Sequence, residues 1–162
     1  MFRMPRLCLS LVLAVSLAGC LAPNTDTAHQ QAATDMSERT IIATDQAPAA
    51  VGPYSQAVQV GNTVYLAGQV GLDPATGSLV EGGVEAETHQ VMANIEAVLT
   101  EAGFSLAHVV QAQVFLADLN DYAAMNAIYG SYFDTSPPAR AAFEVARLPL
   151  DARVEIMVTA AK

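Results

Sequence analysis

The sequence is poor in cysteine, in positive charge and in clustered histidine. Its 2 cysteines, Cys8 and Cys20, lie near the start, so the rest of the chain has no thiol for a disulfide, a metal or a nucleophile. The 7 basic and 16 acidic residues give a net charge of −9, which argues against nucleic acid or an anionic membrane surface as a partner. We expect no metal site, because the three histidines are scattered along the chain: His29, His89 and His108.

The first 19 residues have the pattern of a secretory signal. Two arginines precede an apolar run, Leu7–Ala18, which is too short to span a membrane stably. The tetrapeptide Leu17-Ala-Gly-Cys20 resembles the bacterial lipobox, in which the signal is cut before the cysteine and that cysteine is acylated. An uncut signal anchor and a plain secretory signal are the alternatives. We therefore expect a lipoprotein signal peptide over 1–19 and lipidation at Cys20.

Residues 20–39 separate this signal from the first periodic pattern. They are rich in Ala, Thr, Asp and Gln without apolar periodicity, as in a solvated tether. A chain cut before Cys20 would keep 5 basic and 16 acidic residues, a net charge of −11. No acidic residue directly follows Cys20, which favours the periplasmic leaflet of a bacterial outer membrane. The sequence thus divides into a signal (1–19), a lipidated tether (20–39) and one domain (40–162).

The domain shows apolar patterns with strand and helix periods in a definite order. Alternating residues on either side of Gly61-Asn62 predict a β-hairpin with positive φ at both turn residues. Gly103 suits the end of the first helix. The predicted elements are a strand at 41–44, hairpin strands at 54–60 and 63–68, a helix at 84–102, a strand at 109–117, a helix capped by Asn120 or Asp121, and two adjacent strands at 139–146 and 154–160.

This order predicts an α+β fold, a βαβ-containing sheet with both helices on one face. The sheet's other face would then be apolar and uncovered, which predicts an oligomer. His89 and Glu96 fall off the apolar stripe of the first helix and should face solvent. The second helix carries a stripe that we assign to the core: Tyr122, Met125, Tyr129, Tyr132 and Phe133. Solvation and helix capping explain the paired carboxylates, Glu85 with Glu87 and Asp118 with Asp121.

The C-terminal stretch contains the best candidates for chemistry, Arg140 and Glu155. Pro137-Pro138 excludes a helix, so Arg140 opens an otherwise apolar strand, where a guanidinium can bind a carboxylate through two hydrogen bonds. Glu155 alternates with apolar residues and would lie on the strand face opposite to theirs. On residue types alone, the better interpretation is an ordinary ion pair of Arg140 with Glu144, Asp151 or Glu155.

The same stretch, PPARAAFEVARLPLDARVEI, is similar to the C-terminal signature of the RidA (YjgF-type) family of enamine/imine deaminases, P-P-A-R-S-x-x-E-V-A-R-L-P-x-x-A-x-V-E-I. Residues 44–61 and 65–71 match the family's motifs A-P-x-x-x-G-P-Y-S-Q-A and x-x-S-G-Q-x-G. Asn126 matches the asparagine of its D-L-x-D-F-x-x-x-N pattern. The similarity covers residues 41–161 almost without gaps.

The resemblance implies a chorismate-mutase-like fold and a homotrimer with three clefts between subunits. It implies hydrolytic deamination of 2-aminoacrylate-type enamine/imine intermediates to 2-keto acids and ammonia, as by a 2-iminobutanoate/2-iminopropanoate deaminase, without a cofactor. Arg140 would clamp the substrate carboxylate, and Glu155, with a raised pKa, would orient the attacking water or carry its proton. The implied substrate-binding positions are Tyr54, Gly68, which would let backbone approach the ligand, Asn126 and Ala142.

Three positions depart from the family pattern. Ala67 and Ala141 stand where serine is frequent, and Ala142 stands where some members have cysteine. The missing hydroxyls and thiol, together with a compartment far from the cytoplasmic source of the family's substrates, keep two alternatives open. One is a lipid-tethered protein that binds small carboxylates without turnover. The other is a trimeric holdase or interaction module.

Overall fold

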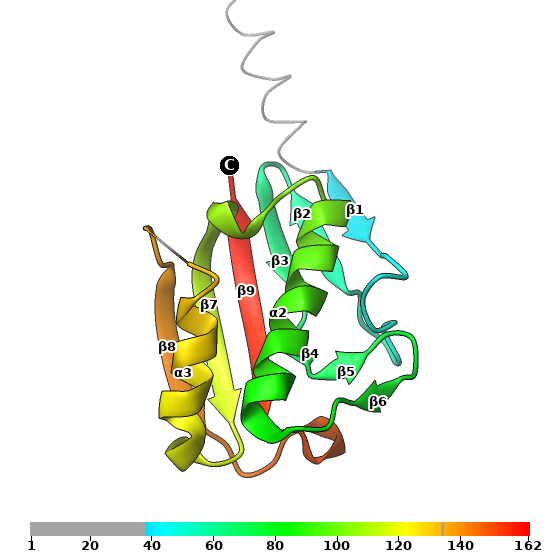
Figure 1. The fold of residues 1–162 in the computed structure, drawn as a ribbon. Coiled ribbons are helices and arrows are strands. Elements are labelled where there is room, and N and C mark those ends of the chain that lie inside the picture. The colour runs from blue at the N-terminus through cyan, green and yellow to red at the C-terminus, as the bar shows by residue number, and fades with distance from the viewer. Residues whose placement is uncertain (1–37, 134) are drawn as a thin grey trace, which may run out of the picture.

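The structure, a computed structural model, describes residues 38–133 and 135–162 (Figure 1). The expected signal peptide, the lipidation site at Cys20 and nearly all of the tether lie outside the described residues. None of the helices in the described part has the length and apolar character needed to cross a bilayer. The elements in chain order are β1 (Arg39–Ile42), β2 (Ala57–Val60), β3 (Thr63–Leu66), β4 (Gln69–Val70), β5 (Leu72–Asp73), β6 (Ser78–Leu79), α2 (Gly83–Glu101), η1 (Leu106–His108), β7 (Val109–Leu116), η2 (Leu119–Asp121), α3 (Tyr122–Gly130), β8 (Ala139–Glu144), η3 (Pro149–Asp151) and β9 (Val154–Ala161).

The main sheet has the strand order β1-β2-β3-β9-β7-β8, and the short β4 pairs with another part of β9. β8 runs parallel to β7, whereas the other pairs are antiparallel. The predicted adjacency of the last two strands is therefore wrong, because β7 lies between β8 and β9. The connection from β7 through α3 returns β8 to one edge of β7, which leaves the other edge of β7 for β9.

The hairpin of β2 and β3 forms as predicted, with Val60 opposite Thr63. Gly61 has φ 56°, but Asn62 is not among the described residues with positive φ. One glycine thus supplies the left-handed conformation, where the sequence predicted both turn residues to do so. Gly103, at φ 75°, ends α2 as expected: its N–H donates to the Thr100 carbonyl (2.9 Å), and the Phe104 N–H donates to the Leu99 carbonyl (2.7 Å).

Both helices cover one face of the sheet, as predicted, and lie side by side in Figure 1. The apolar stripe of α2 packs against alternate residues of β9, and these side chains are fully buried: Val91, Ile95, Val98, Leu99, Val154, Ile156 and Val158. Each such side chain contributes about 1.5–3 kcal/mol relative to exposure. His89 and Glu96 are exposed, as expected.

The start of α3 differs from the prediction in two respects. The 3₁₀ turn η2 precedes the helix, and the Asp118 carboxylate accepts a hydrogen bond from the Asn120 N–H (2.9 Å). Asp118 therefore caps η2, whereas Asp121 occupies the N-cap position of α3, as predicted, but its side chain makes no capping hydrogen bond. The aromatic stripe is only partly core, because Met125 and Tyr129 are buried while Tyr122 is 40% exposed.

The face of the sheet away from the helices carries exposed apolar side chains. Tyr65 of β3 is 53% exposed and Phe143 of β8 is 50% exposed. Phe143 stacks on Phe115 of β7 with ring centroids 6.3 Å apart. Neither helix covers this face, as the alternation of the strands predicted.

Candidate active site

Arg140 is held on the helix-covered face by side chains of α3. One guanidinium nitrogen, Nη2, donates to the Asn126 Oδ1 (2.5 Å) and to the Tyr122 hydroxyl (3.1 Å). The guanidinium carbon lies 4.5 Å from the centroid of the Tyr129 ring, within cation–π distance. The structure thus brings Arg140 and Asn126 together, as the sequence comparison implied, and adds two tyrosines.

The ion-pair interpretation of Arg140 is wrong for the part of the chain that the structure describes. Asp151 pairs with Arg147 at 2.6 Å, and Glu144 accepts a hydrogen bond from the Leu119 N–H at 2.9 Å. Neither carboxylate contacts Arg140, and the described residues form no salt bridge to it. Instead, Arg140 lines a cavity of about 410 Å³ together with Asn126, Tyr129, Gly130, Phe133, Pro137 and Pro138.

The ring of Tyr129 packs against the guanidinium of Arg140. Its side chain is only 4% exposed, and its hydroxyl has no hydrogen-bond partner in the described part of the protein. Burial raises the pKa of Tyr129 to about 12, and the positive charge of Arg140 opposes that rise only in part. The phenol therefore stays neutral beneath the guanidinium at any ordinary pH.

Glu155 lies on the opposite face of the sheet. It alternates along β9 with the buried Val154 and Ile156, and its backbone pairs with that of Val70 in β4. Partial burial raises the pKa of the Glu155 carboxyl, as expected. A carboxyl with a raised pKa is suited to accepting and returning a proton near neutral pH.

Gly68 makes room for the Glu155 side chain. A Cβ at residue 68 would overlap Glu155 Oε1 and would lie 2.8 Å from its Cδ. The resemblance to the family implied that Gly68 lets backbone approach the ligand. In this structure the Glu155 carboxyl fills that space. Only glycine allows the carboxyl to lie directly against this backbone.

Tyr54 lies on the loop before β2 and is exposed. Its hydroxyl accepts a hydrogen bond from the Val51 N–H (3.2 Å), which folds the ring back over the loop. It lines a cavity of about 530 Å³ with Arg39, Tyr65 and Ala67, the residue directly before Gly68. Tyr54 therefore belongs to the Gly68–Glu155 side of the molecule.

The candidate residues thus form two separate groups within one chain. Arg140 is in register with Ala112 of β7, which pairs with Val158 of β9, and these neighbours share the helix-covered face. Ala142 lies on that same face and packs against the core. Glu155 points to the uncovered face, so a site that uses both Arg140 and Glu155 requires a second copy of the chain.

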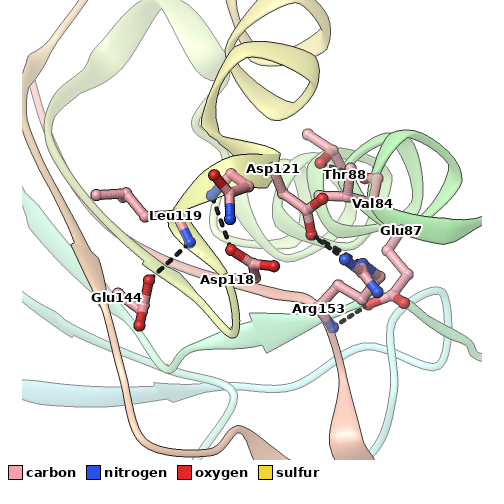
Figure 2. Close-up of polar contacts among 9 residues, drawn as sticks. Val84, Glu87, Thr88, Asp118, Leu119, Asp121, Glu144 and Arg153 are labelled. Carbon is pink, nitrogen blue, oxygen red and sulfur yellow. Dashed lines mark hydrogen bonds and ion pairs between the residues drawn. The ribbon is translucent and has the colours of Figure 1, made fainter.

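A polar network fixes α3, and so the Arg140 group, to the strands (Figure 2). Arg153, which precedes β9, donates through Nε (2.8 Å) and Nη2 (2.5 Å) to one carboxylate oxygen of Asp121. Its backbone N–H donates to Glu87 Oε2 (2.8 Å). Glu144, at the end of β8, accepts from the N–H of Leu119 in η2. The segment that leads into α3 is thereby tied to α2, β8 and β9.

Glu87 was wrongly assigned to solvent by the sequence analysis. It is only 5% exposed, and its Cβ and Cγ pack against Gly71, where an added Cβ would lie within 2.9 Å of them. Asp121 is likewise an ion-pair partner and not a free carboxylate. Glu87 lies three residues after Val84 and four before Val91, which are both buried, and that helical spacing was the available signal.

Comparison with known proteins assigns this fold and these motifs to one family. The model of the family described as Endoribonuclease L-PSP matches residues 44–162. A goat protein named 2-iminobutanoate/2-iminopropanoate deaminase is 55% identical over 118 residues, which are 73% of this chain and 86% of the goat protein. The human protein of that name is 48% identical over 122 residues, 75% of this chain and 89% of its own.

Solved structures support the same family assignment. RidA from the Antarctic bacterium Psychrobacter sp. PAMC 21119 has a TM-score of 0.74 and 49% identity, and the match covers 76% of this chain and 99% of that one. E. coli TdcF with bound serine has a TM-score of 0.73 and 36% identity, over 76% and 98% of the two chains. The fold is the chorismate-mutase-like arrangement of two helices on a mixed sheet, and the chain belongs to the RidA (YjgF-type) family that the Endoribonuclease L-PSP model describes.

Proposed function

We propose that the domain hydrolyses reactive enamines and imines of the 2-aminoacrylate type to 2-keto acids and ammonia. The observation that carries this proposal is Arg140. It is a guanidinium without a carboxylate partner among the described residues, and it is held by Asn126 and Tyr122 at the wall of a cavity. A fixed cation in such a place suits a small carboxylate. Relatives about 50% identical are named 2-iminobutanoate/2-iminopropanoate deaminases.

The reaction requires one group that binds the substrate carboxylate and one group that accepts and returns a proton. The enamine H₂C=C(NH₂)–COO⁻ takes a proton on its terminal carbon and loses one from nitrogen, which gives the imine. Water then adds to the imine carbon, and the C–N bond breaks to leave the 2-keto acid and ammonia. Arg140 holds the carboxylate through both steps, while Glu155 accepts a proton from the attacking water and returns it to the departing nitrogen.

The two groups act together in a cleft between subunits. Arg140 and Glu155 point to opposite faces of one sheet, and the uncovered face carries exposed apolar residues such as Tyr65 and Phe143. A cyclic homotrimer buries this face and gives three identical clefts, each with Arg140 from one subunit and Glu155 from its neighbour.

Subunit mixing tests this arrangement. The domain, residues 38–162, is suitable for the test because solved relatives are matched over nearly all of their own length by this part of the chain. Arg140→Ala and Glu155→Ala should each abolish ammonia and keto-acid release from an enamine generated in situ. When equal amounts are unfolded together and refolded, about one quarter of the clefts regain both residues, so about one quarter of wild-type activity should return. No recovery would contradict a shared cleft.

Cleavage of RNA, which the family model's description names, fits this chain poorly. The described residues include five basic side chains, and two of these, Arg147 and Arg153, are neutralised by aspartates. The whole chain has a net charge of −9. Without a basic surface, no electrostatic attraction offsets the repulsion between the domain and a polyanion.

Binding without turnover is the second candidate. Ala67, Ala141 and Ala142 remove two hydroxyls and a thiol that the family pattern places around the site. The alternative predicts that wild-type protein binds pyruvate saturably, that Arg140→Ala does not, and that neither releases ammonia. A holdase function would instead be indifferent to Arg140.

We further propose that the chain is a lipoprotein with residues 1–19 as its signal, Cys20 as its acylated first residue and 20–39 as a tether. The lipobox-like Leu17-Ala-Gly-Cys20 supports this, and so does the family match, which begins only at residue 44. The domain would then face the periplasm, held by acyl chains at a bacterial membrane, with the outer membrane favoured.

Metabolic labelling tests the anchor. In a bacterial host given radiolabelled palmitate, the full-length protein should take up label and fractionate with membranes. Cys20→Ser should take up no label and should leave the membrane fraction, while Cys8→Ser, which changes a cysteine inside the signal, should behave as wild type. Label on the Cys20→Ser protein would refute the assignment.

A further inference from the structure

Three side chains of α3 that contact Arg140 follow one helical face. Tyr122, Asn126 and Tyr129 are spaced i, i+4 and i+7, so they lie above one another on the helix. We call these three residues the α3 platform. Tyr122 and Asn126 accept hydrogen bonds from Nη2 of Arg140, and the Tyr129 ring lies beneath the guanidinium.

The platform engages one nitrogen of Arg140 and leaves the others available. A guanidinium has five N–H groups, two of them on Nη2. Both Nη2 hydrogens are taken by the platform, whereas Nε and Nη1 have no hydrogen-bond partner in the part of the chain that the structure describes. The carboxylate of a ligand therefore meets a guanidinium whose plane is already set.

Tyr122, like Tyr129, is a platform residue that the resemblance to the family did not single out. It occupies the position of phenylalanine in the family pattern D-L-x-D-F-x-x-x-N, so its hydroxyl is the new element at this position. That hydroxyl lies 3.1 Å from Nη2, on a ring that is 40% exposed. The residue directly before it, Asp121, is tied to Arg153, so the first turn of α3 is anchored to β9.

We infer that the Tyr122 hydroxyl positions Arg140 for carboxylate binding, and that it acts through Arg140 without touching the substrate. This inference rests on the proposed function, since it assigns a role within the same carboxylate site. A long, flexible side chain such as arginine loses rotamer freedom when it binds a ligand. A second fixed acceptor beside Asn126 removes part of that loss before the ligand arrives. The hydroxyl should therefore lower KM and the ligand Kd with little effect on kcat.

Tyr122→Phe removes one oxygen atom and keeps the ring, so the change tests the hydroxyl alone. Tyr132→Phe is the matched control, because Tyr132 hydrogen-bonds His89 (2.9 Å) and makes no hydrogen bond to Arg140. The Kd for pyruvate is measured by calorimetry on the purified domain, and kcat and KM are measured with 2-aminoacrylate generated in situ. Tyr122→Phe should raise Kd and KM about 3- to 10-fold and change kcat less than about 2-fold. Tyr132→Phe should change none of the three.

The outcomes separate this inference from the proposed function. If wild type binds pyruvate without turnover, the deaminase proposal fails, and the Kd comparison still decides the role of Tyr122. An unchanged Kd in Tyr122→Phe would overturn the inference, as would a tighter Kd, which would mean that the hydroxyl competes with the ligand for Nη2. Equal losses in Tyr122→Phe and Tyr132→Phe would indicate general loosening around α3 and would also overturn it. The absence of pyruvate binding by wild type would remove the anion site on which the inference depends.

Discussion

The substitution Gly68→Ala tests most directly how the Glu155 carboxyl is positioned. The added Cβ would overlap Glu155 Oε1 and would lie 2.8 Å from Cδ and 3.1 Å from Cγ. Carbon atoms in contact are about 3.5–4.0 Å apart, so Cδ must move by about 0.7 Å or more. Gly68 is not among the glycines with positive φ, so alanine fits the backbone itself. The substitution therefore displaces a carboxyl and leaves the chain path unchanged.

Two opposing effects on stability follow. Displacing the Glu155 side chain from its rotamer costs about 0.5–1.5 kcal/mol. Replacing glycine by alanine at a permitted backbone conformation stabilises by about 0.4–1 kcal/mol through the unfolded state. The free energy of unfolding should therefore fall by about 1 kcal/mol at most. Because a misplacement of about 1 Å in a catalytic group costs about 100-fold, kcat should fall about 10- to 100-fold.

A double-mutant cycle in thermal unfolding tests the reasoning without any assay of activity. In a Glu155→Ala background the obstructing carboxyl is gone, so Gly68→Ala should raise the free energy of unfolding by about 0.4–1 kcal/mol. The two backgrounds should thus differ by about 0.5–1.5 kcal/mol in their response to the same substitution. An identical response in both backgrounds would refute the contact between residue 68 and Glu155. A separate measurement that finds full activity of Gly68→Ala would refute the expected fall in kcat.

Substitutions at Tyr129, Glu155 and Glu87 give expected changes in stability. Tyr129→Phe removes a buried hydroxyl that has no hydrogen-bond partner among residues 38–133 and 135–162, so the free energy of unfolding should rise by about 1 kcal/mol at pH 7. Because the folded pKa is raised to about 12, wild type should lose stability as pH rises above about 10, and the advantage of Tyr129→Phe should widen in alkaline denaturation curves. Glu155→Gln should raise Tm by about 1–2 °C at pH 7, since a raised folded pKa makes the ionised carboxyl unfavourable in the fold; the gain should vanish near pH 4, below the ordinary glutamate pKa. Glu87→Leu should cost about 1–3 kcal/mol in urea denaturation because the Arg153 N–H loses its acceptor, whereas Glu87→Gln, which can still accept, should cost less than about 1 kcal/mol.

The elements of the fold could be predicted because each depends on local signals. The α2 stripe, the Gly103 helix end, the hairpin at Gly61 and the alternation of β9 are fixed by spacing and by one or two special residues. Which strands become neighbours is not a local property. Two alternating runs joined by a short loop suggest a hairpin, but η3 carries the chain past β7, and β9 pairs on the far side of that strand.

The motifs predicted which residues belong to the site. They did not predict which side chains contact one another. Arg140 and Asn126 were expected to share a pocket, and their hydrogen bond agrees. The role of Glu87 was missed because a glutamate one turn into a helix is usually solvated, and only the tertiary approach of Arg153 and Gly71 buries it. Tyr122 was assigned to the core because aromatic residues at helical spacing usually belong there.

The position of β8 explains why the proposed site needs a second copy of the chain. β8 is an edge strand, and its residues alternate between the two faces, so Arg140 and Phe143 point to opposite sides. Shifting β8 by one residue would put Arg140 on the same face as Glu155, but it would turn Ala142 out of the core, and β7 would still lie between the two residues. The cavity beside Arg140 is lined by residues of α3 and by Pro137 and Pro138, which precede β8 at the edge of the sheet. In the proposed trimer, assembly around the uncovered face would bury the apolar residues there and would bring Glu155 of a neighbouring subunit to Arg140.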